Sequence, residues 1–113
     1  MKAGEMVLIR LPQAGGGPLK LRPALVLCLL PGPYQNILIC GVSTQLNKLE
    51  PNWDEQIAPA DPDFASSGLH GISAARLSYR YAADRTEIAG VIGRIDASRL
   101  KRLVGRLAVH LQR

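Results

Sequence analysis

The sequence has few of the residue types on which disulfide and metal scaffolds depend. Its 113 residues include two cysteines, two histidines, one tryptophan and one phenylalanine. Cys28 and Cys40 both lie within apolar stretches, so we expect buried thiols that pack as small hydrophobic groups. Two cysteines and two histidines without short spacing argue against a zinc site. The sequence therefore predicts neither a disulfide scaffold nor a metal centre.

Long hydrophobic runs are also missing. The longest, residues 24–30, is too short to span a bilayer and ends at Pro31. The apolar stretch of the N-terminal "MKAGEMVLIRLP" is short and carries Glu5 and Arg10, which is not the pattern of a signal peptide. The length and a mean hydropathy of +0.05 suit one globular domain over residues 1–113. We expect a cytoplasmic protein.

Acidic residues are scarce in the second half of the chain. Residues 65–113 carry nine bases and three acids, whereas residues 46–64 carry five acids and one base. The net charge is +5. A basic half of this kind attracts polyanions, either nucleic acid or an acidic protein partner. The alternative is a solvated surface that keeps the protein soluble.

Apolar segments separated by proline and glycine predict a mainly β protein. "PQAGGGPLKL", residues 12–21, suits a loop because three glycines lie between two prolines. Residues 24–30 are apolar enough for a strand covered on both faces. The strands that we expect span residues 6–11, 24–30, 37–44, 72–79 and 87–95, with a short one at 55–57.

The C-terminal segment predicts a helix. Asp96 is a good N-cap for a helix beginning at Ala97, and Ile95 can pack on Leu100 as a hydrophobic staple. We expect one apolar stripe with helical spacing, formed by Leu100, Leu103, Val104, Leu107 and Leu111. The spacing puts Arg99, Arg102 and Arg106 on other faces, and Gly105 suggests close packing. Several short strands followed by a helix favour a small, strongly curved sheet or barrel.

Arg22 is the sharpest candidate for chemistry. It follows the glycine-rich loop and Lys20, and Pro23 restricts it to extended geometry. A planar guanidinium fixed at the entrance of a strand suits bidentate binding of phosphate. The alternative is a strand-end arginine whose charged end reaches water.

The segment "VSTQ" is the second candidate. Ser43 and Thr44 offer hydroxyls and Gln45 offers an amide at the end of an apolar strand, where they can orient a phosphate near a cation. Ordinary turn chemistry explains the same residues. His70, in a predicted loop, is the better placed of the two histidines for proton transfer. The sequence contains no Walker loop, HExxH or GxSxG motif.

Taken together, "GEMVLIRLP", a glycine-containing loop, "LRPALVL" and "ICGVSTQ" resemble the MazF/PemK (Kid-like) toxins of bacterial type II toxin–antitoxin systems. The resemblance is good over residues 4–45 and continues in order through "HGISAARLSYRYAADRTEI" and the terminal helix. The Arg-Pro strand with S-T-Q downstream is the specific part of the match. It implies an α+β, mainly β fold, namely a small SH3-like (CcdB/PemK-type) β-barrel with a C-terminal helix, usually as a homodimer.

The resemblance also implies an activity. Many members are metal-independent endoribonucleases that cut single-stranded RNA, leave a 2′,3′-cyclic phosphate and inhibit growth, with an antitoxin as partner. The essential arginine of the family falls on Arg22 and its essential threonine on Ser43, so we assign these two as catalytic, without cofactor or metal. A further set is assigned to RNA binding: Lys20, Thr44, Gln45, Arg76 and Arg80.

One strand departs from the family pattern. Where many members carry an acidic residue followed by glutamine, this chain has Ser78 and Tyr79. The departure keeps an alternative open, a non-cleaving member of the same fold that inhibits a gyrase-like partner, as CcdB-type relatives do, or only binds RNA. A third reading is a small SH3-like adaptor that binds protein tails. The base that removes the 2′-hydroxyl proton is not identified; His70 and water are the candidates.

Overall fold

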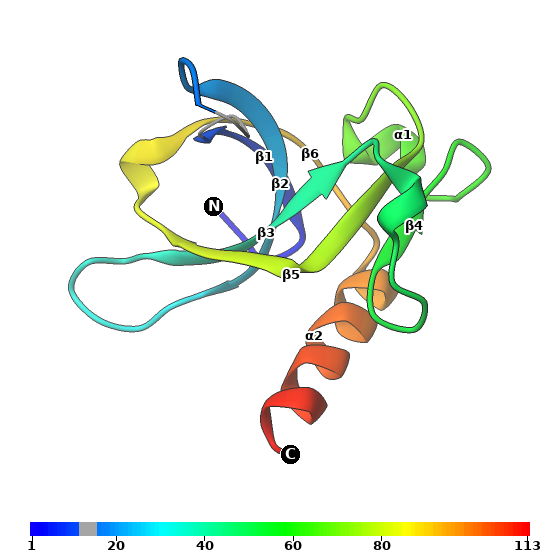
Figure 1. Ribbon diagram of the computed structural model, residues 1–113. Coiled ribbons are helices and arrows are strands. Elements are labelled where there is room, and N and C mark those ends of the chain that lie inside the picture. The colour runs from blue at the N-terminus through cyan, green and yellow to red at the C-terminus, as the bar shows by residue number, and fades with distance from the viewer. Residues whose placement is uncertain (12–15) are drawn as a thin grey trace.

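In the part of the chain that the structure describes, six strands form one antiparallel sheet in the order β4-β5-β3-β2-β1-β6 (Figure 1). The computed structural model describes residues 1–11 and 16–113. The strands are β1 (Glu5–Leu11), β2 (Lys20–Leu29), β3 (Ile37–Ser43), β4 (Glu55–Ile57), β5 (Ser73–Ala83) and β6 (Ile88–Arg94). The helices are η1 (Leu46–Lys48), α1 (Phe64–Ser67), η2 (Arg85–Glu87) and α2 (Ala97–Leu111). None of the described helices has the length and apolar character that a membrane crossing needs.

The predicted strands are all present, with shifted bounds. The predicted loop over residues 12–21 is wrong at its end, because Lys20 and Leu21 begin β2 and pair with Leu11 and Arg10 of β1. Residues 12–15 of that loop lie outside the described residues. The fifth strand extends to Ala83, four residues beyond the predicted end. Antiparallel pairing with β3 continues to Ala83 and supports this longer strand.

The sheet bends strongly and has a core on each side. Register shifts interrupt the pairing of β1 with β6, of β2 with β3 and of β3 with β5, and such irregularities bend and twist strands. The ribbon curls into a partial barrel with α2 packed at one end (Figure 1). One buried cluster, which includes Met6, Leu25 and Leu77, packs with α2, and a second, which includes Val7 and Ile39, lies apart from it. The predicted mainly β, SH3-like fold with a C-terminal helix is confirmed.

Helix α2 begins as predicted, but its buried face is narrower. Asp96 accepts a hydrogen bond from the backbone N–H of Ser98 and caps the first turn. Leu103 and Leu107 are buried, whereas Leu111 is 68% exposed, so the stripe does not continue to the end of the helix. The expected close packing at Gly105 is wrong, because a Cβ there would meet no described atom within 4 Å apart from its chain neighbours and the backbone of its own helix.

The remainder of the buried face of α2 is a charged cluster that the helical pattern did not predict. Arg99 is buried, and its Nε and Nη2 donate to Asp63 at 2.8 and 2.9 Å. Asp61 and Glu55 also accept from the same guanidinium, each at 3.0 Å. The hydrogen bonds from Arg99 lower the pKa of Asp63 below its usual value. Four of the hydrogen bonds from this guanidinium go to carboxylates of the acidic segment, and a fifth goes to the backbone carbonyl oxygen of Gln56 at 2.9 Å.

Pairing of this kind removes part of the basic charge from the surface. Arg102 and Arg106 also bind Glu55, at 2.8 and 3.1 Å. Much of the positive charge of α2 therefore neutralises the acids of residues 55–63. Arg22 and Arg80 on the sheet are exposed cations outside this cluster.

The two thiols differ in burial. Cys40 is fully buried in the core, and burial raises the pKa of its thiol to about 12. Cys28 is only half-buried, which corrects the expectation for that residue. Neither cysteine forms a disulfide.

Candidate functional site

A cavity of about 390 Å³ opens where β2, β3 and β5 end their pairing. Its lining comprises Leu11, Arg22, Pro23, Gly41, Val42, Ser43, Thr44, Gln45, Ser73, Arg76 and Tyr79. No acidic residue is among these described lining residues. The cavity is therefore a cationic, hydroxyl-bearing site, which we call the phosphate cavity because such groups bind anions.

The sheet register brings Arg22 and Ser43 to this cavity. Ala24 of β2 pairs with Gly41 of β3 in an antiparallel ladder. Arg22 lies two residues before Ala24, and Ser43 lies two residues after Gly41, so both continue from the same end of the ladder. The two residues predicted to be catalytic therefore line one cavity, while their catalytic role stays a prediction.

Pro23 lies at the point where the pairing between β2 and β3 ends. Proline has no N–H and is tolerated where a ladder ends. β2 pairs with β3 only from Ala24 onward, while Pro23 and Arg22 remain paired with Leu8 and Ile9 of β1. Arg22 is consequently held on an ordered strand, and its side chain is exposed.

The polar end of β3 forms a short local turn. The Oγ of Ser43 accepts a hydrogen bond from the backbone N–H of Gln45 at 3.1 Å. This contact leaves the hydroxyl hydrogen of Ser43 available as a donor. Thr44 and Gln45 are exposed and line the same cavity.

Arg76 supplies a second cation, from β5. Although its side chain is almost fully buried, Arg76 lines the phosphate cavity. Its Nε lies 3.3 Å from Oδ2 of Asp54 in an ion pair but has no hydrogen-bond partner. Its guanidinium carbon lies 4.8 Å from the ring centroid of Tyr79, in a cation–π arrangement. The guanidinium of Arg76 is therefore oriented by the carboxylate of Asp54 and by the ring of Tyr79.

Asp54 is a site residue that the sequence did not reveal. Its Oδ1 accepts from the backbone N–H of Leu77 and its Oδ2 from that of Glu50, each at 2.9 Å. With three contacts, the buried carboxylate joins the segment before β4 to β5 beside Arg76. The segment "NWDEQ" carries no recognisable motif, so no signal in the sequence could have found this role.

The remaining predicted residues lie elsewhere. Arg80 lines a neighbouring hollow of about 640 Å³ that shares Leu11, Gly41 and Tyr79 with the phosphate cavity. Lys20 is exposed on β2, two residues before Arg22, but is not among the lining residues of either cavity. His70 is exposed and also lines neither. The structure thus groups five of the seven predicted site residues in one cavity: Arg22, Ser43, Thr44, Gln45 and Arg76.

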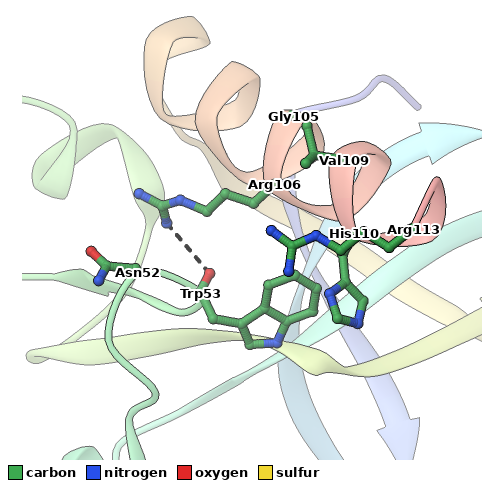
Figure 2. A pocket seen from close by; sticks show the side chains of 7 residues that line it. All are labelled: Asn52, Trp53, Gly105, Arg106, Val109, His110 and Arg113. Atoms are coloured by element: carbon green, nitrogen blue, oxygen red, sulfur yellow. Dashed lines mark hydrogen bonds between the residues drawn. The ribbon is translucent and has the colours of Figure 1, made fainter.

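A separate hollow of about 430 Å³ lies beside the C-terminal part of α2 (Figure 2). There Trp53 and His110 meet edge to face, with ring centroids 5.1 Å apart. Arg106 lines the hollow but is already bound to Glu55 and to the carbonyl oxygen of Trp53. In residues 1–11 and 16–113, no three His, Cys, Asp or Glu side chains are grouped so that they could hold a metal ion.

Comparison with known proteins identifies a family. Residues 2–111 match the family described as PemK-like, MazF-like toxin of type II toxin–antitoxin system. No protein of curated function matches the chain significantly in sequence.

Two solved structures are similar in fold. The Mycobacterium tuberculosis toxin MazF-mt6 is 16% identical, with a TM-score of 0.64 over 94% of this chain and 96% of that chain. A MazE-MazF structure from Deinococcus radiodurans is 23% identical, with a TM-score of 0.61 over 98% of this chain and 94% of that chain. At these identities the likeness concerns the fold.

Proposed function

Because the chain belongs to the PemK-like, MazF-like family of type II toxin–antitoxin toxins, we propose that it is an endoribonuclease that cuts single-stranded RNA. One observation carries the proposal: Arg22, Ser43 and Arg76 line a single cavity that has no acid among its described lining residues. Two cations and a hydroxyl suit a phosphodiester, whose charge grows during cleavage.

The proposed reaction is an internal transfer that needs no metal. The 2′-oxygen of a nucleotide forms a bond to the adjacent phosphorus, and the bond from phosphorus to the 5′-oxygen breaks. The products are a 2′,3′-cyclic phosphate and a 5′-hydroxyl. The 2′-hydroxyl proton leaves to a base, and a proton reaches the departing 5′-oxygen. Holding the substrate in this geometry removes much of the entropic barrier.

Arg22 and Ser43 act on the phosphoryl oxygens. The guanidinium of Arg22 binds two oxygens at once, and the Ser43 hydroxyl donates to an oxygen as negative charge develops. Arg22 hardly deprotonates, so it does not serve as the base. Its N–H groups hydrogen-bond to the leaving 5′-oxygen, to which water delivers the proton. Since His70 does not line the cavity, we assign the removal of the 2′-hydroxyl proton to water. Thr44, Gln45 and Arg76 position the RNA, with Lys20 and Arg80 binding its backbone on either side.

Two protein partners belong to the proposal. A cognate antitoxin with an acidic segment would occupy the cationic cavity and block RNA, since opposite charges give such an interface its specificity. A second copy of the chain would form a homodimer, and the toxin would act in the cytoplasm to inhibit growth. Light scattering on the purified protein tests the dimer.

Cleavage of RNA in EDTA tests the enzyme proposal. We expect the wild-type protein to cut an unstructured RNA without metal and the Arg22→Ala variant to cut at least about 100-fold more slowly. Arg94→Ala is the matched control, because Arg94 is exposed at the end of β6 and does not line the phosphate cavity. Equal cutting by the wild type and Arg22→Ala would overturn the proposal.

One observation favours a second candidate, RNA binding without cleavage. Ser78 and Tyr79 stand where many family members carry an acid and glutamine. A protein that retards RNA in a gel but produces no fragments would support it. Detection of a cyclic phosphate end would eliminate it.

A further inference from the structure

Strand β5 bulges beside the phosphate cavity. Arg80 pairs with Cys40 and Arg76 with the next residue of β3, Gly41. Residues 77–79 therefore have no partner in β3. Bulges re-aim side chains and are common next to functional sites.

Side chains from other parts of the chain hold this bulge. The N–H of Leu77 donates to Oδ1 of Asp54 at 2.9 Å, and the carbonyl oxygen of Leu77 accepts from Nη1 of Arg80 at 2.7 Å. The Oγ of Ser78 accepts from Nε1 of Trp53 at 2.8 Å. These three hydrogen bonds satisfy the backbone of Leu77 and the hydroxyl oxygen of Ser78, and they brace the bulge on the side next to Asp54 and Trp53.

The braced bulge presents the ring of Tyr79 to solvent. Tyr79 is 59% exposed even though Arg76, which lies over its ring, is only 9% exposed. The guanidinium therefore covers part of the ring and leaves an aromatic surface free. An aromatic ring on a fixed backbone with a cation behind it is a suitable stacking surface.

Tyr79 also stands between two hollows of different chemistry. The phosphate cavity offers cations and hydroxyls. The neighbouring hollow of about 640 Å³, which we call the apolar hollow, has mostly apolar exposed surface and includes Leu11, Leu19, Ile39 and Tyr81, although Arg10, Arg80 and Glu87 also line it. Tyr79 lines both. A nucleotide has the same two parts, a charged phosphate and a flat base with apolar faces.

We propose that Tyr79 is a stacking platform for the nucleobase next to the phosphate bound by Arg22, with that base entering the apolar hollow. This inference rests on the proposed function, because it assigns the substrate of the same site. Arg76 is then a positioning residue as well as a cation, since it supports the ring from behind. The platform recognises a base by its face and sets the register of the RNA on the protein.

An abasic scan tests the platform. The probe is a 2′-fluoro single-stranded oligonucleotide with the sequence that the wild-type protein binds most tightly, so the attacking hydroxyl is absent and binding is measured without cleavage. One abasic residue is moved along it. We expect one position where loss of the base weakens wild-type binding about 10-fold, as for other base–aromatic stacks. In Tyr79→Ala that position has no further effect, and the intact probe binds about 10-fold more weakly.

Two control variants sharpen the test. Tyr79→Phe keeps the ring and should keep the abasic penalty. Tyr34→Ala removes a tyrosine that is 82% exposed in the turn between β2 and β3, and it should bind like the wild type. Thermal unfolding of each variant confirms that it is folded.

The outcomes separate this inference from the proposed function. An abasic penalty that is unchanged in Tyr79→Ala, or equal at every position, overturns the platform while RNA cleavage stands. In that case the exposed ring is left as a contact for a protein partner. A wild-type protein that neither binds nor cuts single-stranded RNA overturns both.

Discussion

Asp54 and Arg76 form a buried ion pair, with Oδ2 and Nε 3.3 Å apart, at the edge of the cavity that also holds Arg22 and Ser43. The same carboxylate holds the backbone of Leu77 in the β5 bulge. Asp54, which belongs to no sequence motif, thus joins the phosphate cavity to the bulge of β5 that lies beside it.

Removal of the Asp54 charge tests this link. Asp54→Asn keeps an acceptor for the Leu77 N–H but leaves Arg76 without its counter-charge. Because breaking a buried pair leaves an uncompensated charge, we expect the free energy of unfolding to fall by about 3 kcal/mol in urea titrations. Glu50→Gln is the control, since Glu50 is exposed and its hydrogen bonds with Asp54 run through its backbone N–H and its backbone carbonyl oxygen, which the substitution leaves in place. Equal stability of Asp54→Asn and wild type would contradict the stabilising role of the ion pair with Arg76.

Ser43 is expected to act through its hydroxyl. Ser43→Ala removes the donor and should slow RNA cleavage by about 100-fold, the effect of losing one donor to a developing oxyanion. Ser43→Thr keeps the hydroxyl and should keep most of the activity. Single-turnover cleavage assays measure both variants. Similar losses in the two variants would show that the site depends on the shape of the serine rather than on its donor.

Asp63 should make stability depend on pH. Its pKa is lower in the folded protein than its ordinary value of 3.8 because Arg99 donates to it. The ionised carboxylate therefore stabilises the fold well above that value, and the contribution is lost as the pH falls through the folded-state pKa. We expect Asp63→Asn to unfold about 3 kcal/mol more easily at neutral pH. The gap from wild type should shrink below about pH 4 in urea titrations. A gap that is constant with pH would refute this assignment.

Two glycines should respond in opposite ways to alanine. A Cβ at Gly93 would lie 2.2 Å from the carbonyl oxygen of Ser66, so Gly93→Ala forces α1 and β6 apart and should lower the melting temperature. Gly105→Ala meets open space within α2 and should raise stability by about 0.5–1 kcal/mol through helix propensity. Calorimetry measures the melting temperature of each variant, which should fall in Gly93→Ala and rise in Gly105→Ala. A stabilised Gly93→Ala would show that the contact between α1 and β6 is loose.

The site was predictable where its residues come from strand ends that are neighbours in a simple sheet. Arg22 follows a glycine-rich loop, Ser43 closes an apolar strand, and antiparallel pairing of these two strands is enough to bring them together. The roles proposed for them rest on local signals, namely a guanidinium before proline and two hydroxyl residues followed by an amide.

The rest depends on contacts between distant segments, which carry no local pattern. Asp54 reaches β5 across a bulge whose position follows from packing and not from periodicity. Arg99 was placed away from the apolar stripe because helical patterns treat charge as exposed. Three carboxylates from residues 55–63 compensate its burial, and only the folded chain assembles them. The prediction for Leu111 was wrong in the opposite direction. The apolar stripe was expected to include it, but it is exposed, because nothing in the described structure covers the last turn of α2.

The chemistry of the cut RNA ends tests the central claim most directly. The substrate is an RNA with a single cut site, incubated in EDTA, alongside the same RNA with a 2′-deoxy residue at the cut nucleotide. We predict fragments that end in a 2′,3′-cyclic phosphate and begin with a 5′-hydroxyl, no cutting of the 2′-deoxy substrate, and no fragments from Arg22→Ala on the same timescale. Cutting of the 2′-deoxy substrate, or fragments that begin with a 5′-phosphate, would contradict the mechanism.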